Sequence, residues 1–358
     1  MISVTTPVNS LGYGVVGRGL VRALHSAGAR PALFPIGPVD CPDDDIHLLR
    51  KLATDALRYD PQAPSFRLWH GWEMAHHPTR GLRSGATFFE LDRLRPEEVY
   101  QLNQLDIVFA FGGWAAGVMR RSGVTAAIRE IHCAVDTDVF CLRPLPEDGP
   151  TVFVNAGKWE IRKGHDVLLS AFLRAFCPDD DVRLIMLCDN PFLSPDEAAG
   201  WVEYYKNHPL ADKVVVLPRQ PTRQDVAGVF AQAHCGVFPS RGEGWNMEAM
   251  ELLAMGRHVI ATAATAHLDY MSAKNAILVP PGPDEPAYDG KWFSGQGNWV
   301  SIPDHCIDQF AERMREFHQN RLAGHLLENE AGVETCRSLT WGSSALKIVD
   351  GLGVSYGV

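Results

Sequence analysis

The sequence predicts an α/β protein of two domains, each built on a parallel β-sheet covered by helices. Short apolar runs alternate with longer amphipathic segments from end to end of the 358-residue chain. Runs of four to eight residues rich in Val, Ile and Phe are typical of buried parallel strands, and the segments between them are typical of helices. At about 150 residues per domain, the length also suits two domains.

The apolar runs give the predicted strands in chain order. In the first half they are residues 2–8, 31–36, 66–71, 86–91 and 107–112. In the second half they are residues 151–157, 182–188, 213–219, 235–240, 258–263 and 276–281.

Two of the predicted helices have clear boundary signals. Thr222 and Asp225 have the spacing of a capping box and predict a helix over 222–233. Gly256 follows a second predicted helix, 246–255, and suits the left-handed position that ends a helix.

A segment rich in proline divides the chain. Residues 141–150 contain three prolines and a glycine, which predicts a linker and a domain boundary near residue 148. We therefore expect an N-terminal domain over 1–147 and a C-terminal domain over 148–335. Ligands of such folds bind at the carboxyl ends of the strands, so we expect the site in a cleft between the halves.

Composition excludes several classes of protein. With 46% hydrophobic residues the chain can form a sizeable core, which excludes disordered and collagen-like proteins. The formal net charge is -10 and no long basic run is present, which disfavours a strong nucleic-acid binder. No apolar stretch approaches the roughly 18 residues of a membrane span, and the N-terminus lacks signal-peptide features. The eight cysteines include no CxxC pair and are expected to be reduced thiols of a cytoplasmic protein.

The first candidate site is the glycine-rich turn Gly12-Tyr-Gly14-Val-Val-Gly17, placed between a strand and a helix predicted over 18–27. Such a turn lets backbone N–H groups and a helix N-terminus face an anion. Asp40, the first acidic residue after the second strand, lies outside it, so the ribose-binding carboxylate of a dinucleotide fold is missing. A phosphate-facing loop of another kind, a plain tight turn and a nicotinamide or flavin site all stay open.

The second candidate is a cluster of cations directly after the strand 151–157. Lys158, Arg162 and Lys163 lie between Gly157 and Gly164. They form either a solvated charge run or a site at which Lys158 and Lys163 neutralise a diphosphate.

The third candidate is residues 240–256, where a Gly-Glu-Gly turn carrying Glu243 leads into a helix. Glu251 lies in an apolar stretch of that helix, and a buried carboxylate needs a partner. Ligand hydroxyls, such as a ribose diol, or a structural arginine would serve. The N–H groups of Asn246 and Met247, together with the helix dipole, could hold a phosphate. Glu248 is expected to face solvent or an intramolecular cation.

These motifs resemble those of retaining GT-B glycosyltransferases of the E-x7-E, family 4-like group, which includes phage-type members. Glu243 and Glu251 have the spacing of the paired glutamates. Residues 156–168 are similar to the family's G-[RK]-x4-KG segment, residues 130–140 to the stretch before its linker, and residues 339–341 to the start of its last helix.

The resemblance implies a GT-B fold, with residues 336–358 as a final helix that crosses back to the N-terminal domain. It implies transfer of a hexose from a UDP- or GDP-linked sugar without cofactor or metal. By resemblance, Glu251 would bind the ribose, Glu243 the donor sugar, and Lys158 and Lys163 the diphosphate. The remaining implied residues are Gly14 and His70 near the donor, and Gly244, Trp245, Asn246 and Met247 in the donor-binding loop.

The chain departs from the family pattern at several positions. Lys158 replaces the usual arginine of the phosphate pair, which keeps the charge and loses the fork geometry. Ala134 replaces a glycine, and Trp245-Asn246-Met247 replaces a Phe-Gly-Leu sequence, which leaves the preferred sugar open. Residues 283–299 are predicted to form a long loop, either an acceptor platform or a packed surface loop.

Two metal-like patterns have simpler explanations. The acidic triplets 43–45 and 179–181 contain DxD, but both follow Cys-Pro and suit turns or helix caps. His76 and His77 are interpreted as loop residues rather than a metal pair. We expect no metal site.

The acceptor is the most open part of the prediction. A glycan, a lipid-linked sugar or a small molecule is the first hypothesis, and Glu90 and Arg93 lie on the side expected to bind it. A second hypothesis is transfer to hydroxymethylated pyrimidines of DNA. An NAD-dependent dehydrogenase and a non-catalytic sugar-nucleotide binder complete the alternatives. A basic surface favouring the DNA hypothesis would comprise Arg80, Arg83, Arg93, Arg120 and Arg121.

Overall fold

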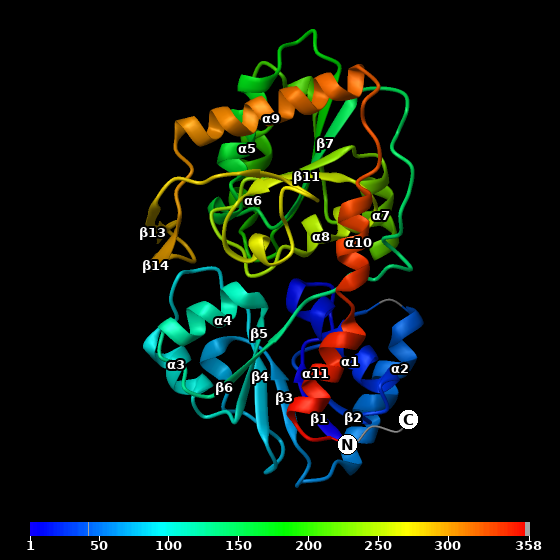
Figure 1. Cartoon of the computed structure of the whole chain (residues 1–358), viewed down its shortest axis with the longest axis vertical. Helices are drawn as coiled ribbons and strands as arrows, with labels where there is room; N and C mark the ends of the chain where they lie inside the picture. The colour runs from blue at the N-terminus through cyan, green and yellow to red at the C-terminus, as the bar shows by residue number, and fades with distance from the viewer. Residues whose placement is uncertain (42, 355–358) are drawn as a thin grey trace. The chain divides into compact units, whose positions relative to one another are not determined.

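The computed structural model describes residues 1–41 and 43–354 and consists of two compact units (Figure 1). Unit 1 comprises Met1–Val135 and the C-terminal segment from Leu339, and unit 2 comprises Asp136–Ser338. The sequence placed the two boundaries near residues 148 and 336. The proline-rich segment 141–150 belongs to unit 2 because the fully buried Arg257 donates hydrogen bonds to the carbonyls of Arg143 and Pro144, at 2.9 and 3.0 Å.

Unit 1 is a six-stranded parallel sheet in the order β2-β1-β3-β4-β5-β6. Its strands are β1 (Ile2–Thr6), β2 (Pro31–Pro35), β3 (Ser65–Leu68), β4 (Arg83–Ala86), β5 (Ile107–Phe111) and β6 (Ala127–Ile131). Its helices are α1 (Gly12–Ser26), α2 (Asp43–Asp55), α3 (Pro96–Leu102), α4 (Gly112–Arg121) and α11 (Trp341–Gly351), with short 3-10 turns at Ala56–Arg58 and Gly71–Glu73.

Helix α1 begins at Gly12, so the prediction of a helix from residue 18 was wrong and the glycine-rich segment forms its first turns. Close packing explains two of these glycines. A Cβ on Gly14 would lie 2.4 Å from the backbone N of Asn9, and one on Gly17 would lie 2.4 Å from the carbonyl O of Pro7. Figure 1 shows α11 beside α1. A Cβ on Gly19 would lie 2.5 Å from the ring of Trp341, so the glycine leaves room for this side chain.

Unit 2 is a second six-stranded parallel sheet, in the order β12-β11-β10-β7-β8-β9. Its strands are β7 (Thr151–Gly157), β8 (Val182–Cys188), β9 (Val214–Leu217), β10 (Cys235–Phe238), β11 (His258–Thr262) and β12 (Ile277–Val279). Its helices are α5 (His165–Ala175), α6 (Pro195–Tyr204), α7 (Arg223–Ala231), α8 (Met247–Ala254), α9 (Asp304–Leu322) and α10 (Glu330–Ser338), with 3-10 turns at Ile161–Lys163, Ala211–Lys213 and Thr265–Asp269. Helix α9 packs along α5 (Figure 1), and Phe153, Phe172 and Phe310 share the core beneath them.

The two parallel sheets confirm the predicted fold class, and both predicted helix boundary signals are confirmed. Thr222 and Asp225 form the capping box of α7, and Gly256, with φ +75°, follows Met255, the C-cap residue of α8.

Three local predictions were wrong. The strand expected over 86–91 is β4, which ends at Ala86, and the edge strand β6 was missed. The loop expected over 283–299 is an antiparallel hairpin of β13 (Asp284–Tyr288) and β14 (Ser294–Val300).

No helix among the described residues is long and apolar enough to span a membrane.

Candidate functional site

The candidate site of unit 2 is formed by three loops at the carboxyl ends of adjacent strands. Strand β10 pairs with β7 on one side and β11 on the other. The loops that follow these strands therefore meet at one edge of the sheet, where ligands of parallel α/β folds bind.

The loop after β7 is shaped by Gly164 and His165. Gly164 has φ +71°, and a Cβ there would lie 1.9 Å from the carbonyl O of Pro239, so only glycine fits. The backbone N–H of Glu160 donates to His165 Nδ1 at 3.2 Å, so the ring proton lies on Nε2, which is 3.1 Å from Asn155 Oδ1. Burial and the charge of Lys163 lower the pKa of His165 to about 3, so the ring stays neutral.

A buried network of charges joins the loops after β7 and β10. Glu243 accepts hydrogen bonds from Arg162 at 2.9 Å, from Lys163 at 3.1 Å and from Ser240 at 2.8 Å. Glu160 accepts from Arg162 at 2.7 Å and pairs with Lys158 at 3.0 Å. The side chain of Lys158 is 43% exposed, whereas the other charged members of the network are nearly inaccessible.

These pairings keep the network ionised. Burial raises the pKa of the Glu243 carboxyl, but the charges of Lys163 and Arg162 outweigh it, and the pKa falls well below its ordinary value. For Glu160 burial is likewise outweighed by Arg162 and Lys158, and its pKa falls to about 2. Burial lowers the pKa of Lys163, and Glu243 and Glu248 raise it to above the ordinary value.

The loop between β10 and α8 is held in a strained conformation. Asn246 has φ +74° and caps α8, with its Oδ1 accepting from the N–H of Ala249 at 3.2 Å. Its Nδ2 lies 2.9 Å from His267 Nε2. Thr265 has φ +51°, and its Oγ1 accepts from the N–H of Glu243 at 2.9 Å. Asn246 lies in the loop between β10 and α8, and Thr265 begins the 3-10 turn after β11. Such conformations cost roughly 1–3 kcal/mol each and cluster at functional sites, so they mark these two segments as candidates.

Glu251 lies inside α8, where its buried carboxylate forms an ion pair with the partly exposed Arg223 of α7. The sequence left two partners open for this carboxylate, ligand hydroxyls and a structural arginine. The structure contains the arginine. The Arg223 guanidinium also lies over the Phe140 ring, 4.7 Å from its centroid.

The remaining predicted donor-binding residues occupy the same loop. Trp245 is buried and stacks on Tyr270, with ring centroids 5.2 Å apart. Gly244 is buried beside it, and Met247 is the first residue of α8. Glu248 lies 3.8 Å from Lys163, an intramolecular cation as expected.

In unit 1 the candidates lie near the carboxyl ends of β1 and β3. Gly14 is in the first turn of α1, and His70 follows β3. The His70 ring stacks on Trp72 with centroids 4.4 Å apart and an interplanar angle of 5°, and it meets the Tyr13 ring at 5.1 Å.

Other residues singled out in the sequence have structural partners. His77 binds Ser65 and the carbonyl of Met74, and burial lowers its pKa to about 4. The basic residues Arg93 and Arg120 pair with Asp92 and Glu130.

One residue of each acidic triplet has a protein partner, and the side chains of Asp43 and Asp44 lie outside the described residues. Asp45 pairs with Arg18 and Arg22, and Asp180 accepts a hydrogen bond from the backbone N–H of Cys177. Among the side chains that the structure describes in residues 1–41 and 45–354, no three His, Cys, Asp or Glu residues are grouped as metal ligands.

Sequence reasoning missed several members of the site. Glu160 lies between the predicted cations Lys158 and Arg162. Its position two residues before Arg162 could have identified it as their carboxylate partner. Arg223 lies in the capping box of the predicted helix 222–233, which gives no sign of a ligand site, and Thr265 and His267 lie in a segment without a motif, so only the fold brings them to Glu251, Glu243 and Asn246.

Comparison with known proteins identifies a family that is similar to part of the chain. Residues 150–289 match the family model described as Glycosyl transferases group 1. No curated protein sequence matches the chain significantly.

Solved structures similar to the chain cover nearly all of it. A sucrose-phosphate synthase from Thermosynechococcus elongatus has a TM-score of 0.70 at 17% identity, covering 98% of this chain and 97% of that one. HepE of Anabaena, solved with UDP and glucose, has a TM-score of 0.67 at 15% identity, covering 99% of each chain. A glycosyltransferase from Rickettsia africae has a TM-score of 0.64 at 13% identity, covering 98% of this chain and 97% of that one.

At these identities the structural likeness shows the fold, which is GT-B. The family match covers the segment that contains Lys158, Lys163, Glu243 and Glu251. Residues 150–289 of unit 2 therefore match a glycosyltransferase domain, and the protein is an enzyme of the glycosyltransferase class.

Proposed function

We propose that the protein is a retaining, metal-independent glycosyltransferase that moves a hexose from a UDP-linked sugar to an acceptor hydroxyl. The observation that carries this proposal is the charge network of Glu160, Arg162, Lys163 and Glu243 beside the N-terminus of α8. Cations and a helix N-terminus favour the negative charge that develops on a departing diphosphate. The HepE structures, which contain UDP or UDP-glucose, support uridine over guanosine.

Each residue has a role within this proposal. Lys158 is the exposed cation and reaches the diphosphate, with Lys163 behind it. Glu243 fixes Lys163 and offers its remaining acceptor capacity to a hydroxyl of the donor sugar. Glu251, oriented by Arg223, faces the ribose diol. In unit 1, Gly14 and His70 remain the residues proposed to contact the donor.

The proposed chemistry needs no covalent enzyme intermediate. The acceptor oxygen forms its bond to the anomeric carbon on the face from which the diphosphate leaves, and the C–O bond to the phosphate breaks. The acceptor proton passes to the leaving phosphate oxygen, so charge is balanced. We further propose a cytoplasmic location, which the eight unbridged cysteines support.

A thermal-shift series tests the proposal. Ligand at about 100 times its Kd adds roughly 2.7 kcal/mol to the free energy of unfolding. UDP, GDP, ADP and their glucose, galactose, mannose and N-acetylglucosamine conjugates are compared on wild type and on Lys158→Met, with the exposed Lys274→Met as control. We expect UDP and one UDP-sugar to raise Tm in wild type and control, and much less in Lys158→Met.

Product analysis tests the finer statements. With the donor so identified, NMR of the product should give the anomeric configuration of the donor, and EDTA should leave the rate unchanged. No shift with any nucleotide, or equal shifts in Lys158→Met, would contradict the donor site. An inverted product would contradict retention, and loss of activity in EDTA would contradict metal independence.

A further inference from the structure

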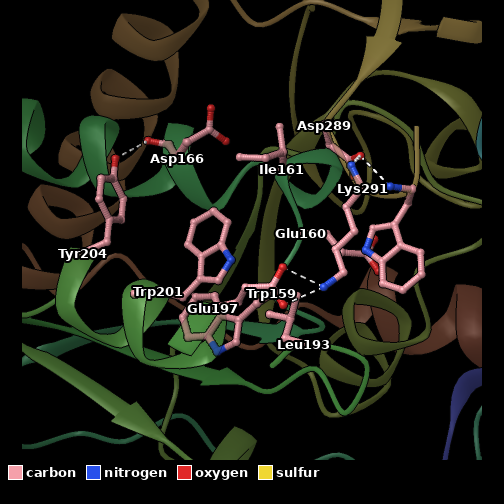
Figure 2. Close-up of a pocket in the computed structure, with 12 residues that line it drawn as sticks. Trp159, Glu160, Ile161, Asp166, Leu193, Glu197, Trp201, Tyr204, Asp289 and Lys291 are labelled. Carbon is pink, nitrogen blue, oxygen red and sulfur yellow. Dashed lines mark hydrogen bonds and ion pairs between the residues drawn. The ribbon is translucent and has the colours of Figure 1, made fainter. Parts of the chain in front are cut away.

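Unit 2 contains an open pocket of about 500 Å³ that the proposed transfer chemistry does not use (Figure 2). Its walls come from the loop after β7, from the first turn of α5, from α6 and the loop before it, and from the turn of the β13–β14 hairpin. Glu160 lines the pocket and also belongs to the charge network, so the pocket adjoins the proposed donor site within the same unit.

Aromatic side chains give the pocket flat, rigid faces. Trp201 stacks on Trp159 with centroids 5.6 Å apart and an interplanar angle of 6°, and Trp159 is itself buried. Trp292 of the hairpin turn is 44% exposed and Tyr204 of α6 is 41% exposed. Exposed aromatic side chains gathered in one concave region are typical of binding sites rather than of ordinary surface.

The polar groups of the pocket are fixed acceptors. Asp166 is held by Arg241 at 2.7 and 2.9 Å. Asp289 accepts the backbone N–H groups of residues 291, 292 and 293 at 2.9, 2.7 and 2.9 Å. Glu197 pairs with Lys291 at 2.6 Å. Figure 2 shows Trp201 and Trp159 between the Tyr204–Asp166 side and the Glu197–Lys291 pair.

This combination selects the chemistry of a ligand. The lining carboxylates outnumber Lys291, the one cation among the lining residues, and that cation is already paired. Three of the four lining carboxylates are also paired with cations, so the lining offers no unpaired cation to a phosphate or a uronic acid. A carboxylate with one or two bonds can still accept hydroxyl donors. Flat aromatic faces together with hydroxyl acceptors suit the apolar face and the rim hydroxyls of a neutral pyranose.

We propose that this pocket binds a neutral pyranose segment of the acceptor, with a ring packed on Trp292 and hydroxyls donated to Asp166 and Asp289. This inference rests on the proposed function and narrows its acceptor to a neutral oligosaccharide or polysaccharide. The pocket holds the chain of the glycan beside the loop of Glu160, apart from the hydroxyl that reacts.

Binding without donor tests the proposal independently of turnover. The probes are cellohexaose, maltohexaose, mannohexaose and chitohexaose, with hexagalacturonate as the anionic counterpart. Saturation-transfer NMR and calorimetry are run on the full chain, on Trp292→Ala and on Tyr288→Ala. Tyr288 is the matched control because it is 68% exposed on the same hairpin and does not line the pocket.

We expect at least one neutral hexasaccharide to bind wild type and Tyr288→Ala alike. Trp292→Ala should weaken that binding roughly ten-fold or more, as for the loss of an aromatic anchor. Hexagalacturonate should bind more weakly than the best neutral probe. UDP should not displace the bound hexasaccharide, and the Tm increase with UDP-glucose should be the same in all three proteins.

Several results would overturn the inference. They are no binding of any neutral probe, equal binding by Trp292→Ala, tightest binding of hexagalacturonate, and displacement of the glycan by UDP. Failure of every nucleotide to raise Tm while the glycan still binds would instead overturn the proposed donor chemistry and leave the pocket standing.

Discussion

The two units place different chemistry at the same position of the same kind of sheet. At the carboxyl ends of β7 and β10, unit 2 buries the ion pairs of Glu160, Arg162, Lys163 and Glu243. At the carboxyl ends of β1, β3 and β4, unit 1 gathers aromatic rings. These are Tyr13, Trp69, His70, Trp72 and Phe88, whose ring contacts range from 4.4 to 5.5 Å.

These two clusters are stabilised by different kinds of contact. Ion pairs buried in unit 2 need every partner, because an unpaired buried charge is far more costly than the pair is stabilising. The aromatic cluster of unit 1 rests on apolar contact and a few hydrogen bonds, so loss of one group is a smaller, local loss. We call the buried ion pairs of unit 2 the charged edge and the ring cluster of unit 1 the aromatic edge. Single substitutions should therefore lower the free energy of unfolding more at the charged edge than at the aromatic edge.

The largest effect is expected from Glu243→Gln. Removing this charge leaves Arg162 and Lys163 undercompensated, and breaking a buried pair costs roughly 3–5 kcal/mol. Urea unfolding should show that loss together with a weaker UDP-glucose thermal shift. The control is Glu248→Gln, whose partly exposed carboxylate lies 3.8 Å from Lys163 and should contribute at most about 1 kcal/mol. Equal losses in the two variants would contradict the central place of Glu243.

Next is Gly164→Ala, which tests whether the charged edge depends on backbone contact. The new Cβ would meet the carbonyl O of Pro239 in addition to the strain of φ +71°, so we expect a loss of roughly 3 kcal/mol. Gly324→Ala is matched, because it has the same φ with open space around the Cβ, and should cost only about 1 kcal/mol. If Gly164→Ala and Gly324→Ala lower the free energy of unfolding equally, the contact with Pro239 adds nothing, which would contradict the argument from close packing.

Much of the fold follows from apolar runs, and the exceptions are physical. Strand β6 was missed because Arg129 and Glu130 give this edge strand a polar sequence. Strand β4 begins with Arg83-Ser-Gly, which carries no apolar pattern, so the prediction fell on the apolar residues after it. The β13–β14 hairpin is exposed and antiparallel, and its glycines and polar residues are typical of a loop.

The candidate site was predictable only where residue types cluster in sequence. Lys158, Lys163, Glu243 and Glu251 lie in two short motifs and were identified there. Arg223 lies 28 residues before Glu251, and Thr265 lies 22 residues after Glu243, so their pairing depends on the order of the strands. Spacing alone does not reveal such long-range partners.

A smaller effect is expected from pH, through His165 at the charged edge. Because burial lowers its pKa to about 3, the folded state binds fewer protons than the unfolded state below pH 6.5. Stability is therefore complete above pH 6.5 and falls as pH drops toward 3. At pH 5 the loss from this residue is roughly 2 kcal/mol. Glu160, with its pKa near 2, adds its own loss only below its unfolded value of about 4.5.

Urea unfolding at pH 7.5 and pH 5 measures this effect. The variant His165→Asn should lose stability at pH 7.5 but show a flatter dependence on pH than wild type. His305→Asn, at an exposed position of α9, should keep the wild-type slope. If all three proteins have the same slope, His165 does not titrate as its burial requires.

The smallest effect is expected from Tyr13→Phe at the aromatic edge. The Tyr13 hydroxyl accepts a hydrogen bond from the N–H of Phe88 at 2.9 Å and lies 3.2 Å from both Thr87 Oγ1 and the carbonyl O of Phe88. Burial raises the pKa of this hydroxyl well above its ordinary value, so it keeps its proton. Removing it leaves the ring contacts in place and should cost about 1 kcal/mol in urea unfolding, because only hydrogen bonds are lost. Tyr100→Phe, at a position 65% exposed in the same unit, should be neutral. A loss as large as that of Glu243→Gln would contradict the distinction between the two edges, because the aromatic cluster would then depend on a single polar group.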